Sequence, residues 1–285
     1  MVSIRKSLPL LLVLLTPLAS RSRPDAEHVS EAACSLFAQS AAQAFNNEFP
    51  NADISFLLLN ARTGQVLASR WDQPNVPIPL GSLTKPFAAL AYGEHHDSHF
   101  PAYTCRGFET GCWRPGGHGE LDLAAAIAYS CNSYFRFLTA ELRAADVSPT
   151  ASQFGIEPPD GEMSGPELAG LGPRWRISPM RMVRAYLRLL AVREQPAVRE
   201  ILAGMERSAR QGTGAEVDRA LHSGGALVKT GTAACTHPRH APGDGFALAL
   251  VPADEPRILL MVRVHGVPGS RAAKTAGQML RRIGE

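Results

Sequence analysis

The sequence predicts an α+β fold in which an antiparallel sheet is flanked by helices and accompanied by a mostly helical subdomain. Segments with strand-like composition occur near both ends of the chain, at residues 54–60 and 66–71 and again from residue 226 to residue 264. The middle of the chain has helical patterns instead. Segregation of strands and helices along a chain is typical of α+β domains. With 285 residues, 45% of them hydrophobic, the chain is long enough for one good core.

Residues 1–20 have the pattern of a secretory signal peptide. Two basic residues precede an almost wholly apolar run at 8–18, and small residues follow it. This run is about half of the ~20 residues that a membrane-spanning helix needs, which favours a leader that is removed. We therefore expect export to the periplasm or cell envelope, with an uncleaved N-terminal anchor as the alternative. Residues 21–51 are expected to form an N-terminal helix and linker, with the helix at 29–45.

Residues 52–285 are expected to form a single domain. It opens with a hairpin, because a Thr63-Gly64 turn separates the first two strand-like segments. Pro86 fits the first turn of the next helix, where a missing N–H costs nothing. Residues 146–172 contain four prolines and are expected to be rich in turns. The other predicted elements are helices within 121–142, at 178–191, 200–209 and 272–282, and strands at 227–232, 245–251 and 257–264.

Ser82 and Lys85 stand at the start of the alanine-rich helix that follows the hairpin. Their spacing of three places both side chains on one helix face. A serine hydroxyl becomes a good nucleophile when a neighbour takes its proton, and a lysine kept neutral by burial can do so. The free N–H groups of a helix start can also stabilise an oxyanion. Taken alone, the pattern is weak, because it occurs by chance in many proteins and a simple helix-capping serine explains it.

Two further segments favour catalysis. Ser130-Cys131-Asn132 supplies Ser-x-Asn, and Lys229-Thr230-Gly231 supplies Lys-Thr-Gly in a strand-like setting. The order Ser-x-x-Lys, Ser-x-Asn, Lys-Thr-Gly is the signature of penicillin-recognising serine acyltransferases. On these motifs the sequence resembles, from about residue 54 to residue 282, the transpeptidase domain of class B, elongation-type penicillin-binding proteins. The resemblance implies a β-lactamase/transpeptidase-like fold.

The resemblance also implies a role for each motif residue. Four residues are implied to be catalytic: Ser82 as nucleophile, Lys85 as base for acylation, Ser130 as proton relay to the leaving amine, and Lys229 as a positive charge near Ser130. Those implied to bind substrate are Asn132, Thr230, Gly231 and Thr232. Among these, Asn132 would donate to a backbone carbonyl of the acyl donor, and the two threonines would offer hydroxyls to its carboxylate. The backbone N–H groups of Ser82 and Thr232 would form the oxyanion hole.

The reaction implied by the resemblance is acyl transfer from a D-Ala-D-Ala stem peptide through an ester on Ser82, with no cofactor for catalysis. β-Lactams should acylate the same serine. The alternatives within the fold are a D,D-carboxypeptidase, a β-lactamase, and a penicillin-binding sensor or interaction domain without turnover. A class A β-lactamase needs a Glu-x-x-x-Asn pattern, which the glutamates at 157–167 do not supply. A structural protein with a decayed site is disfavoured, because all three motifs are intact.

The expected partners follow from charge and from the resemblance. A net charge of +3 is too small to indicate a nucleic-acid function, and the sequence has no basic stripe with interleaved aromatics, so no nucleic-acid partner is expected. The resemblance implies peptidoglycan stem peptides, β-lactams, and membrane or cell-wall-synthesis partners. Class B proteins carry a large non-catalytic domain before the transpeptidase domain, whereas this sequence has only the helix at 29–45 there. The resemblance therefore does not extend to the domain that serves anchoring and partner binding in the class B proteins.

Cys105, Cys112, His118 and Cys131 are candidate metal ligands. Three thiols and an imidazole can hold a structural Zn²⁺ in a closed tetrahedral site. Some elongation-type relatives resemble this, with a metal held by acidic, His and Cys ligands at similar spacing. The alternative is a Cys105–Cys112 disulfide, which an oxidising compartment would favour. The five cysteines are an odd number, so in an exported chain at least one is a thiol, a metal ligand or an intermolecular partner.

Cys235 follows the third motif and lies near His237 and His240 in the sequence. No metal role is expected for it.

Overall fold

The computed structural model describes residues 25–235 and 243–285. The predicted signal peptide at 1–20, together with His237 and His240, lies outside these residues. No helix in the described part of the chain has the length and hydropathy needed to span a bilayer.

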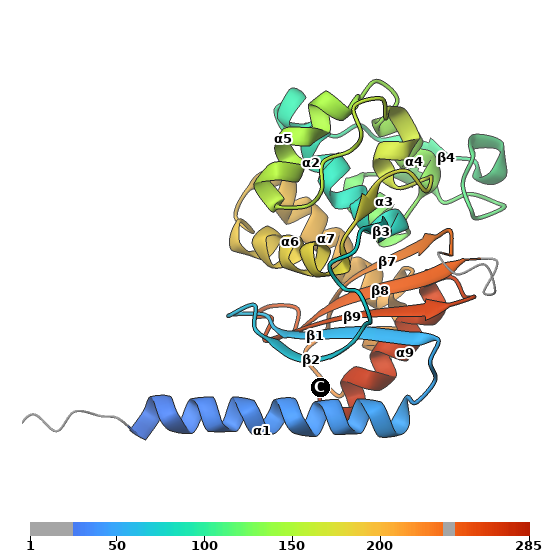
Figure 1. The fold of residues 1–285 in the computed structure, drawn as a ribbon. Coiled ribbons are helices and arrows are strands. Elements are labelled where there is room, and N and C mark those ends of the chain that lie inside the picture. The colour runs from blue at the N-terminus through green and yellow to red at the C-terminus, as the bar shows by residue number, and fades with distance from the viewer. Residues whose placement is uncertain (1–24, 236–242) are drawn as a thin grey trace, which may run out of the picture.

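A five-stranded antiparallel sheet joins the two ends of the described chain, as the sequence predicted (Figure 1). Its strand order is β2-β1-β9-β8-β7. The N-terminal hairpin pairs with the C-terminal strands along the full length of β1, from Ile54 opposite Val264 to Asn60 opposite Ile258. The strands are β1 (Ile54–Asn60), β2 (Val66–Arg70), β7 (Leu227–Ala233), β8 (Asp244–Val251) and β9 (Ile258–His265).

Both faces of the sheet are buried, which explains why its central strands are apolar on successive residues rather than alternating. Along β1, Leu57 and Leu59 pack in the core shared with the helical region. Phe56 and Leu58 point to the opposite face and pack in a second core with α1 (Asp25–Glu48) and α9 (Gly269–Arg282). Figure 1 shows α1 and α9 on the side of the sheet away from the helical region.

The helical region lies between β2 and β7 in the chain and stands over the first face of the sheet (Figure 1). It also holds three 3₁₀ turns and two short two-stranded sheets, β3 with β6 and β4 with β5. Its helices are α2 (Lys85–His95), α3 (Leu123–Ala128), α4 (Asn132–Leu138), α5 (Ala144–Phe154), α6 (Pro179–Ala191), α7 (Pro196–Gln211) and α8 (Ala215–Asp218). The 3₁₀ turns are η1 (Gly81–Thr84), η2 (Gly107–Thr110) and η3 (Gly165–Ala169), and the short strands are β3 (Ile78–Pro79), β4 (Tyr103–Cys105), β5 (Gly119–Leu121) and β6 (Arg176–Ile177).

Sequence signals place several helix boundaries correctly. Ser178 caps α6, since its hydroxyl accepts from the Arg181 N–H at 3.2 Å, and Pro179 is the first helical residue. The segment predicted as turn-rich differs, because it contains α5 with Pro149 inside the helix. Val147 and Phe154 lie on the buried face of α5. The burial of this face outweighs the one backbone hydrogen bond that the proline removes.

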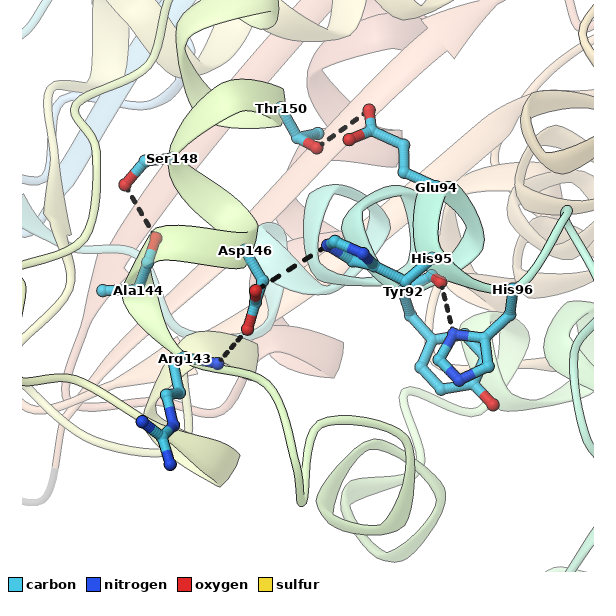
Figure 2. Close-up of polar contacts among 9 residues, drawn as sticks. All are labelled: Tyr92, Glu94, His95, His96, Arg143, Ala144, Asp146, Ser148 and Thr150. Carbon is cyan, nitrogen blue, oxygen red and sulfur yellow. Dashed lines mark hydrogen bonds and ion pairs between the residues drawn. The ribbon is translucent and has the colours of Figure 1, made fainter.

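A hydrogen bond and an ion pair connect α5 to the C-terminal end of α2 (Figure 2). Thr150 donates to Glu94 at 3.1 Å, and His95 lies 3.8 Å from Asp146. Asp146 also accepts from the Arg143 N–H at 2.8 Å, which caps the start of α5. At the other end of the helix pair, the Phe87 and Phe154 rings lie 5.4 Å apart. The helix that begins at Lys85 is therefore held at both ends.

Candidate active site

Ser82 lies in the 3₁₀ turn η1, directly before α2, and its residue is 9% exposed. The turn packs backbone against backbone on the end of β7. Gly81 has φ +56°, and a Cβ there would lie 2.2 Å from the Thr232 carbonyl oxygen. A Cβ on Gly231 would lie 2.5 Å from the Leu80 carbonyl oxygen. Only glycine fits at these two positions, so the first and third motifs meet at a distance that side chains would not allow.

Lys85 begins α2, and its side chain is fully buried beside the second motif. Its Nζ donates to the Ser130 carbonyl oxygen at 2.8 Å and to Asn132 Oδ1 at 2.7 Å, and lies 5.2 Å from the Phe135 ring centre. Among the described residues, no hydrogen bond joins it to Ser82. Burial lowers the pKa of Lys85 to about 7. A substantial fraction of this amine is therefore neutral near pH 7 and able to accept a proton.

The second motif occupies the junction between α3 and α4. Ser130 has φ +50°, an uncommon value for a residue other than glycine. Cys131 caps α4, because its Sγ accepts from the Tyr134 N–H at 3.5 Å. This backbone turn directs the Ser130 carbonyl oxygen to Lys85 and its hydroxyl to Lys229, which donates to Ser130 Oγ at 2.8 Å.

The third motif lies on β7, at the edge of the sheet. Lys229 is fully buried and also donates to the Thr230 carbonyl oxygen at 2.7 Å. Burial, together with the charge of Lys85, holds the pKa of Lys229 well below its usual value. Ser130 is thus contacted by two buried amines, one through its carbonyl oxygen and one through its hydroxyl.

The three motifs open onto one groove of about 660 Å³. The predicted residues that line it are Ser82, Ser130, Asn132, Thr230, Gly231 and Thr232, while Lys85 and Lys229 lie beneath its surface. The Thr230 hydroxyl donates to Thr213 at 2.6 Å, and the Thr232 hydroxyl accepts from the Gly269 N–H at 3.0 Å. All eight catalytic and substrate-binding candidates are therefore gathered around a single concave surface.

Sequence reasoning missed several groups at this groove. Thr213 was not among the predicted site residues, yet its hydroxyl accepts a hydrogen bond from Thr230 of the Lys-Thr-Gly motif. Gly170 ends η3 with φ +69°, and a Cβ there would lie 2.1 Å from the Gly81 carbonyl oxygen. The buried Tyr186 hydroxyl donates to the Leu83 carbonyl oxygen at 3.0 Å and so fixes the nucleophile turn from below. Trp113, half exposed, forms part of the groove wall. The Gly-Thr-Gly run at 212–214 was the available signal for Thr213.

The structure also gathers the four candidate metal ligands, beside the second motif. Cys105 Sγ and Cys112 Sγ each lie 3.5 Å from His118 Nδ1, and Cys112 Sγ lies 3.8 Å from Cys131 Sγ. The four ligand atoms are all within 4.8 Å of one another. Zn–S bonds of about 2.3 Å and Zn–N bonds of about 2.0–2.1 Å give tetrahedral edges of roughly 3.8 Å between sulfurs and 3.5 Å between sulfur and nitrogen. The donor set therefore fits zinc in both chemistry and spacing.

No disulfide joins the cysteines of this cluster in the structure. A hydrogen bond from Cys131 lowers the pKa of the Cys112 thiol and raises that of Cys131. Because Cys131 separates Ser130 from Asn132, whatever holds this thiol also holds the second motif.

Comparison with known proteins identifies the family to which the sequence is similar. A family model described as the penicillin binding protein transpeptidase domain matches residues 54–285. Pseudomonas aeruginosa PBP2 in complex with WCK 5153 is similar in structure, with a TM-score of 0.69 at 17% identity over 86% of this chain and 73% of that chain. PBP2 from Helicobacter pylori in complex with MreC gives 0.70 at 16% identity over 87% and 62%. The transpeptidase domain of Burkholderia pseudomallei penicillin-binding protein 3 gives 0.65 at 17% identity over 88% and 92%.

No curated protein matches the sequence. The structural neighbours share the fold, and the family model covers most of the chain, including all three motifs. The chain therefore belongs to the family of penicillin-binding-protein transpeptidase domains.

Proposed function

We propose that this protein is a peptidoglycan D,D-transpeptidase that works through a covalent acyl-Ser82 intermediate. The observation that carries the proposal is the buried pair of amines around Ser130, at the base of a groove that also exposes Ser82. This arrangement supplies a nucleophile, a base of suitable pKa and a proton relay within one site.

In the acylation step, Ser82 Oγ attacks the carbonyl carbon between the two D-alanines of a stem peptide, and neutral Lys85 takes the hydroxyl proton. The backbone N–H groups of Ser82 and Thr232 stabilise the oxyanion of the tetrahedral intermediate. As the C–N bond breaks, the Ser130 hydroxyl passes a proton to the leaving D-alanine amine and is reprotonated from the lysines beside it. The product is an ester on Ser82.

Substrate binding uses the walls of the groove. The Asn132 side-chain oxygen accepts from Lys85, which leaves its NH₂ group to donate to a carbonyl of the acyl donor. The Thr230 and Thr232 hydroxyls, near buried Lys229, receive the carboxylate of the donor. In the second step an amine of another stem peptide attacks the ester and forms the cross-link. Attack by water would instead give a carboxypeptidase.

No cofactor takes part in this chemistry, but we propose a structural zinc ion held by Cys105, Cys112, His118 and Cys131. It would attach the β4–β5 loop to the second motif.

The relative from Helicobacter pylori is in complex with MreC, and another neighbour belongs to a peptidoglycan synthase complex. By this likeness we propose that the protein is exported to the cell envelope, binds β-lactams and works with cell-wall-synthesis partners. The weak net charge of +3 argues against nucleic acid as a partner.

Intact-mass measurement before and after benzylpenicillin tests the proposal. The wild type and Ser270→Ala should each gain one penicilloyl adduct, whereas Ser82→Ala should gain none. Ser270 is the matched control, because it is an exposed serine that lines the same groove. Failure of the wild type to form an adduct would reject the acyl-serine mechanism.

Turnover then separates the activities that share this intermediate. A transpeptidase should release D-alanine from a stem pentapeptide and join the acyl group to an added amine. Release without joining would identify a carboxypeptidase, and rapid loss of the penicilloyl adduct a β-lactamase. A stable adduct with no release of D-alanine would identify a sensor domain.

A further inference from the structure

The ends of β7, β8 and β9 bring together a second set of metal-ligand side chains. Cys235 follows β7, Asp244 is the first residue of β8, and His265 is the last residue of β9. The register places Asp244 opposite both Ala233 and His265, so the three strand ends are aligned side by side. The ligand atoms of Cys235, Asp244 and His265 all lie within 4.8 Å of one another.

The carboxylate of this set is buried with one oxygen unsatisfied. The Asp244 side chain is 1% exposed and that of His265 is 6% exposed. Asp244 Oδ1 lies 2.6 Å from His265 Nδ1, whereas Oδ2 has no hydrogen-bond partner among the described residues. The charge of the buried Arg263 guanidinium also acts on Asp244, but its hydrogen bond at 2.8 Å goes to Ser55 Oγ. A buried carboxylate oxygen without a partner is costly, and this one points to a cation that satisfies it.

The contacts converge on one point rather than forming a proton relay. In a relay of the Cys-His-Asp kind, thiol and carboxylate bind opposite nitrogens of the imidazole ring. Here Cys235 Sγ lies 3.7 Å from His265 Nδ1, the same nitrogen that Asp244 contacts. The sulfur–nitrogen separation is close to the roughly 3.5 Å edge of a tetrahedral zinc site. A thiolate, an imidazole and a carboxylate are also zinc's usual ligand types.

We propose that Cys235, Asp244 and His265 form a second zinc site, separate from the cluster at Cys105, Cys112, His118 and Cys131. Zinc would displace the Cys235 thiol proton and any proton shared by His265 and Asp244. With both bound to zinc, His265 Nδ1 and Asp244 Oδ1 would move apart from 2.6 Å to about 3.4 Å, the edge of a tetrahedral site. The described residues supply three ligands, one fewer than a tetrahedral zinc site takes.

The position of this site gives it a role in shaping the groove. The groove wall includes Thr232, Ala233 and Ala234, the residues immediately before Cys235. A zinc ion bound to three adjacent strand ends would fix the chain where it leaves the Lys-Thr-Gly strand. It would therefore hold Thr232 against the nucleophile turn. The proposal does not depend on which acyl acceptor the enzyme uses.

Zinc stoichiometry tests the proposal directly. The purified protein is stripped with chelator, reloaded with a small excess of zinc sulfate, desalted and examined by native mass spectrometry. The wild type should hold two zinc ions per chain, and Cys235→Ala and Cys112→Ala should each hold one. The Cys112→Ala/Cys235→Ala double variant should hold none. Cys34→Ala is the matched control, since Cys34 belongs to neither cluster, and it should keep both ions.

Equal zinc content in the wild type and Cys235→Ala would overturn the proposal, and so would a Cys112→Ala variant that binds no zinc. Alkylation of the unaltered protein provides a readout that does not depend on variant folding. Zinc should slow the reaction of Cys235 with iodoacetamide at least tenfold, as measured by peptide mapping. Reaction at the same rate with and without zinc would also reject the site.

Discussion

Lys85 and Lys229 are buried amines that both contact Ser130. Their surroundings set the pKa of each amine and so its ability to accept or donate a proton. Burial disfavours the charged form of each amine, and the charge of Lys85 lowers the pKa of Lys229 further. The contacts of Lys85 fit a base, because two acceptors, the Ser130 carbonyl oxygen and Asn132 Oδ1, orient its amine next to the nucleophile turn. Substrate carboxylate beside Lys229 would favour the protonated form of that amine.

The rate of acylation by benzylpenicillin should therefore follow the titration of Lys85. With a pKa of about 7, the amine is mostly protonated below pH 7 and mostly neutral above it. The second-order rate constant should rise about tenfold per pH unit below pH 7 and level off near pH 8. Stopped-flow or mass measurements from pH 5.5 to 8.5 check this. A rate that does not change over that range would exclude Lys85 as the base.

Lys85→Arg provides the matched variant, because a guanidinium keeps the positive charge but does not give up its proton at these pH values. It should acylate about 10²- to 10⁴-fold more slowly than the wild type at pH 8.

The lowered pKa of Lys85 also affects how the stability of the folded protein depends on pH. Between pH 7 and about 10.4 the unfolded chain binds more protons at this lysine than the folded chain does, so its contribution to stability increases as pH rises through that window.

At the scale of elements, the site depends on how closely β7 approaches η1. The backbone contact at Gly231 leaves no room for a Cβ, which would meet the Leu80 carbonyl oxygen at 2.5 Å. Gly231→Ala should push β7 away from Ser82 and slow penicillin acylation about 100-fold, because a misplacement of about 1 Å is enough for such a loss. Gly161→Ala is the control, since its Cβ would meet nothing within 4 Å. Acylation of Gly231→Ala at the wild-type rate would show that this approach is not needed.

The loop that carries Cys105, Cys112 and His118 is a second element whose position bears on catalysis. Cys112→Ala should lose one zinc ion by native mass spectrometry, unfold at lower temperature and acylate more slowly, because Cys131 is then no longer held between Ser130 and Asn132. Cys34→Ala should match the wild type in all three measurements. A wild-type mass lower by two hydrogens, with peptide mapping that joins Cys105 to Cys112, would identify a disulfide instead of zinc.

The sequence predicts the motif residues well because each motif is local. Ser82 and Lys85 are one helical turn apart, and Lys229 to Thr232 follow one another on a strand. What joins the motifs is not local. The contact of Thr213 with Thr230 depends on how the end of α7 meets β7, and the approach of Gly170 to Gly81 brings η3 to η1.

The same limit explains two other differences from the sequence predictions. The helix at α5 was missed, because Pro149 is a strong local signal whereas the burial of Phe154 against Phe87 is a tertiary one. Asp244 and His265 were not grouped with Cys235, because only the register of β7, β8 and β9 places them together. The fold class needed only the segregation of strands and helices, so it was predicted and is confirmed.

Across the whole molecule, the sheet separates the side that carries the groove from the side that α1 and α9 cover. Residues of the helical region and of β7 line the groove. Figure 1 shows α1 and α9 on the opposite face of the sheet. Phe45 of α1 is fully buried there, and its ring meets Phe56 of β1 edge-on at 5.1 Å. A change at Phe45 should therefore affect folding without reaching the acylation chemistry.

Phe45→Ala should lower the free energy of unfolding by about 3–5 kcal/mol, the usual cost of removing a buried phenylalanine side chain. For a chain of this size that corresponds to a fall in Tm of roughly 6 °C or more. Leu36→Ala on the same helix is the control, because Leu36 is 67% exposed and should shift Tm by less than about 2 °C. Both variants, assayed well below their Tm, should acylate with benzylpenicillin at the wild-type rate. A slower acylation in folded Phe45→Ala would mean that the two faces of the sheet are coupled, since Phe56 and Leu57 are neighbours on β1 that face opposite cores.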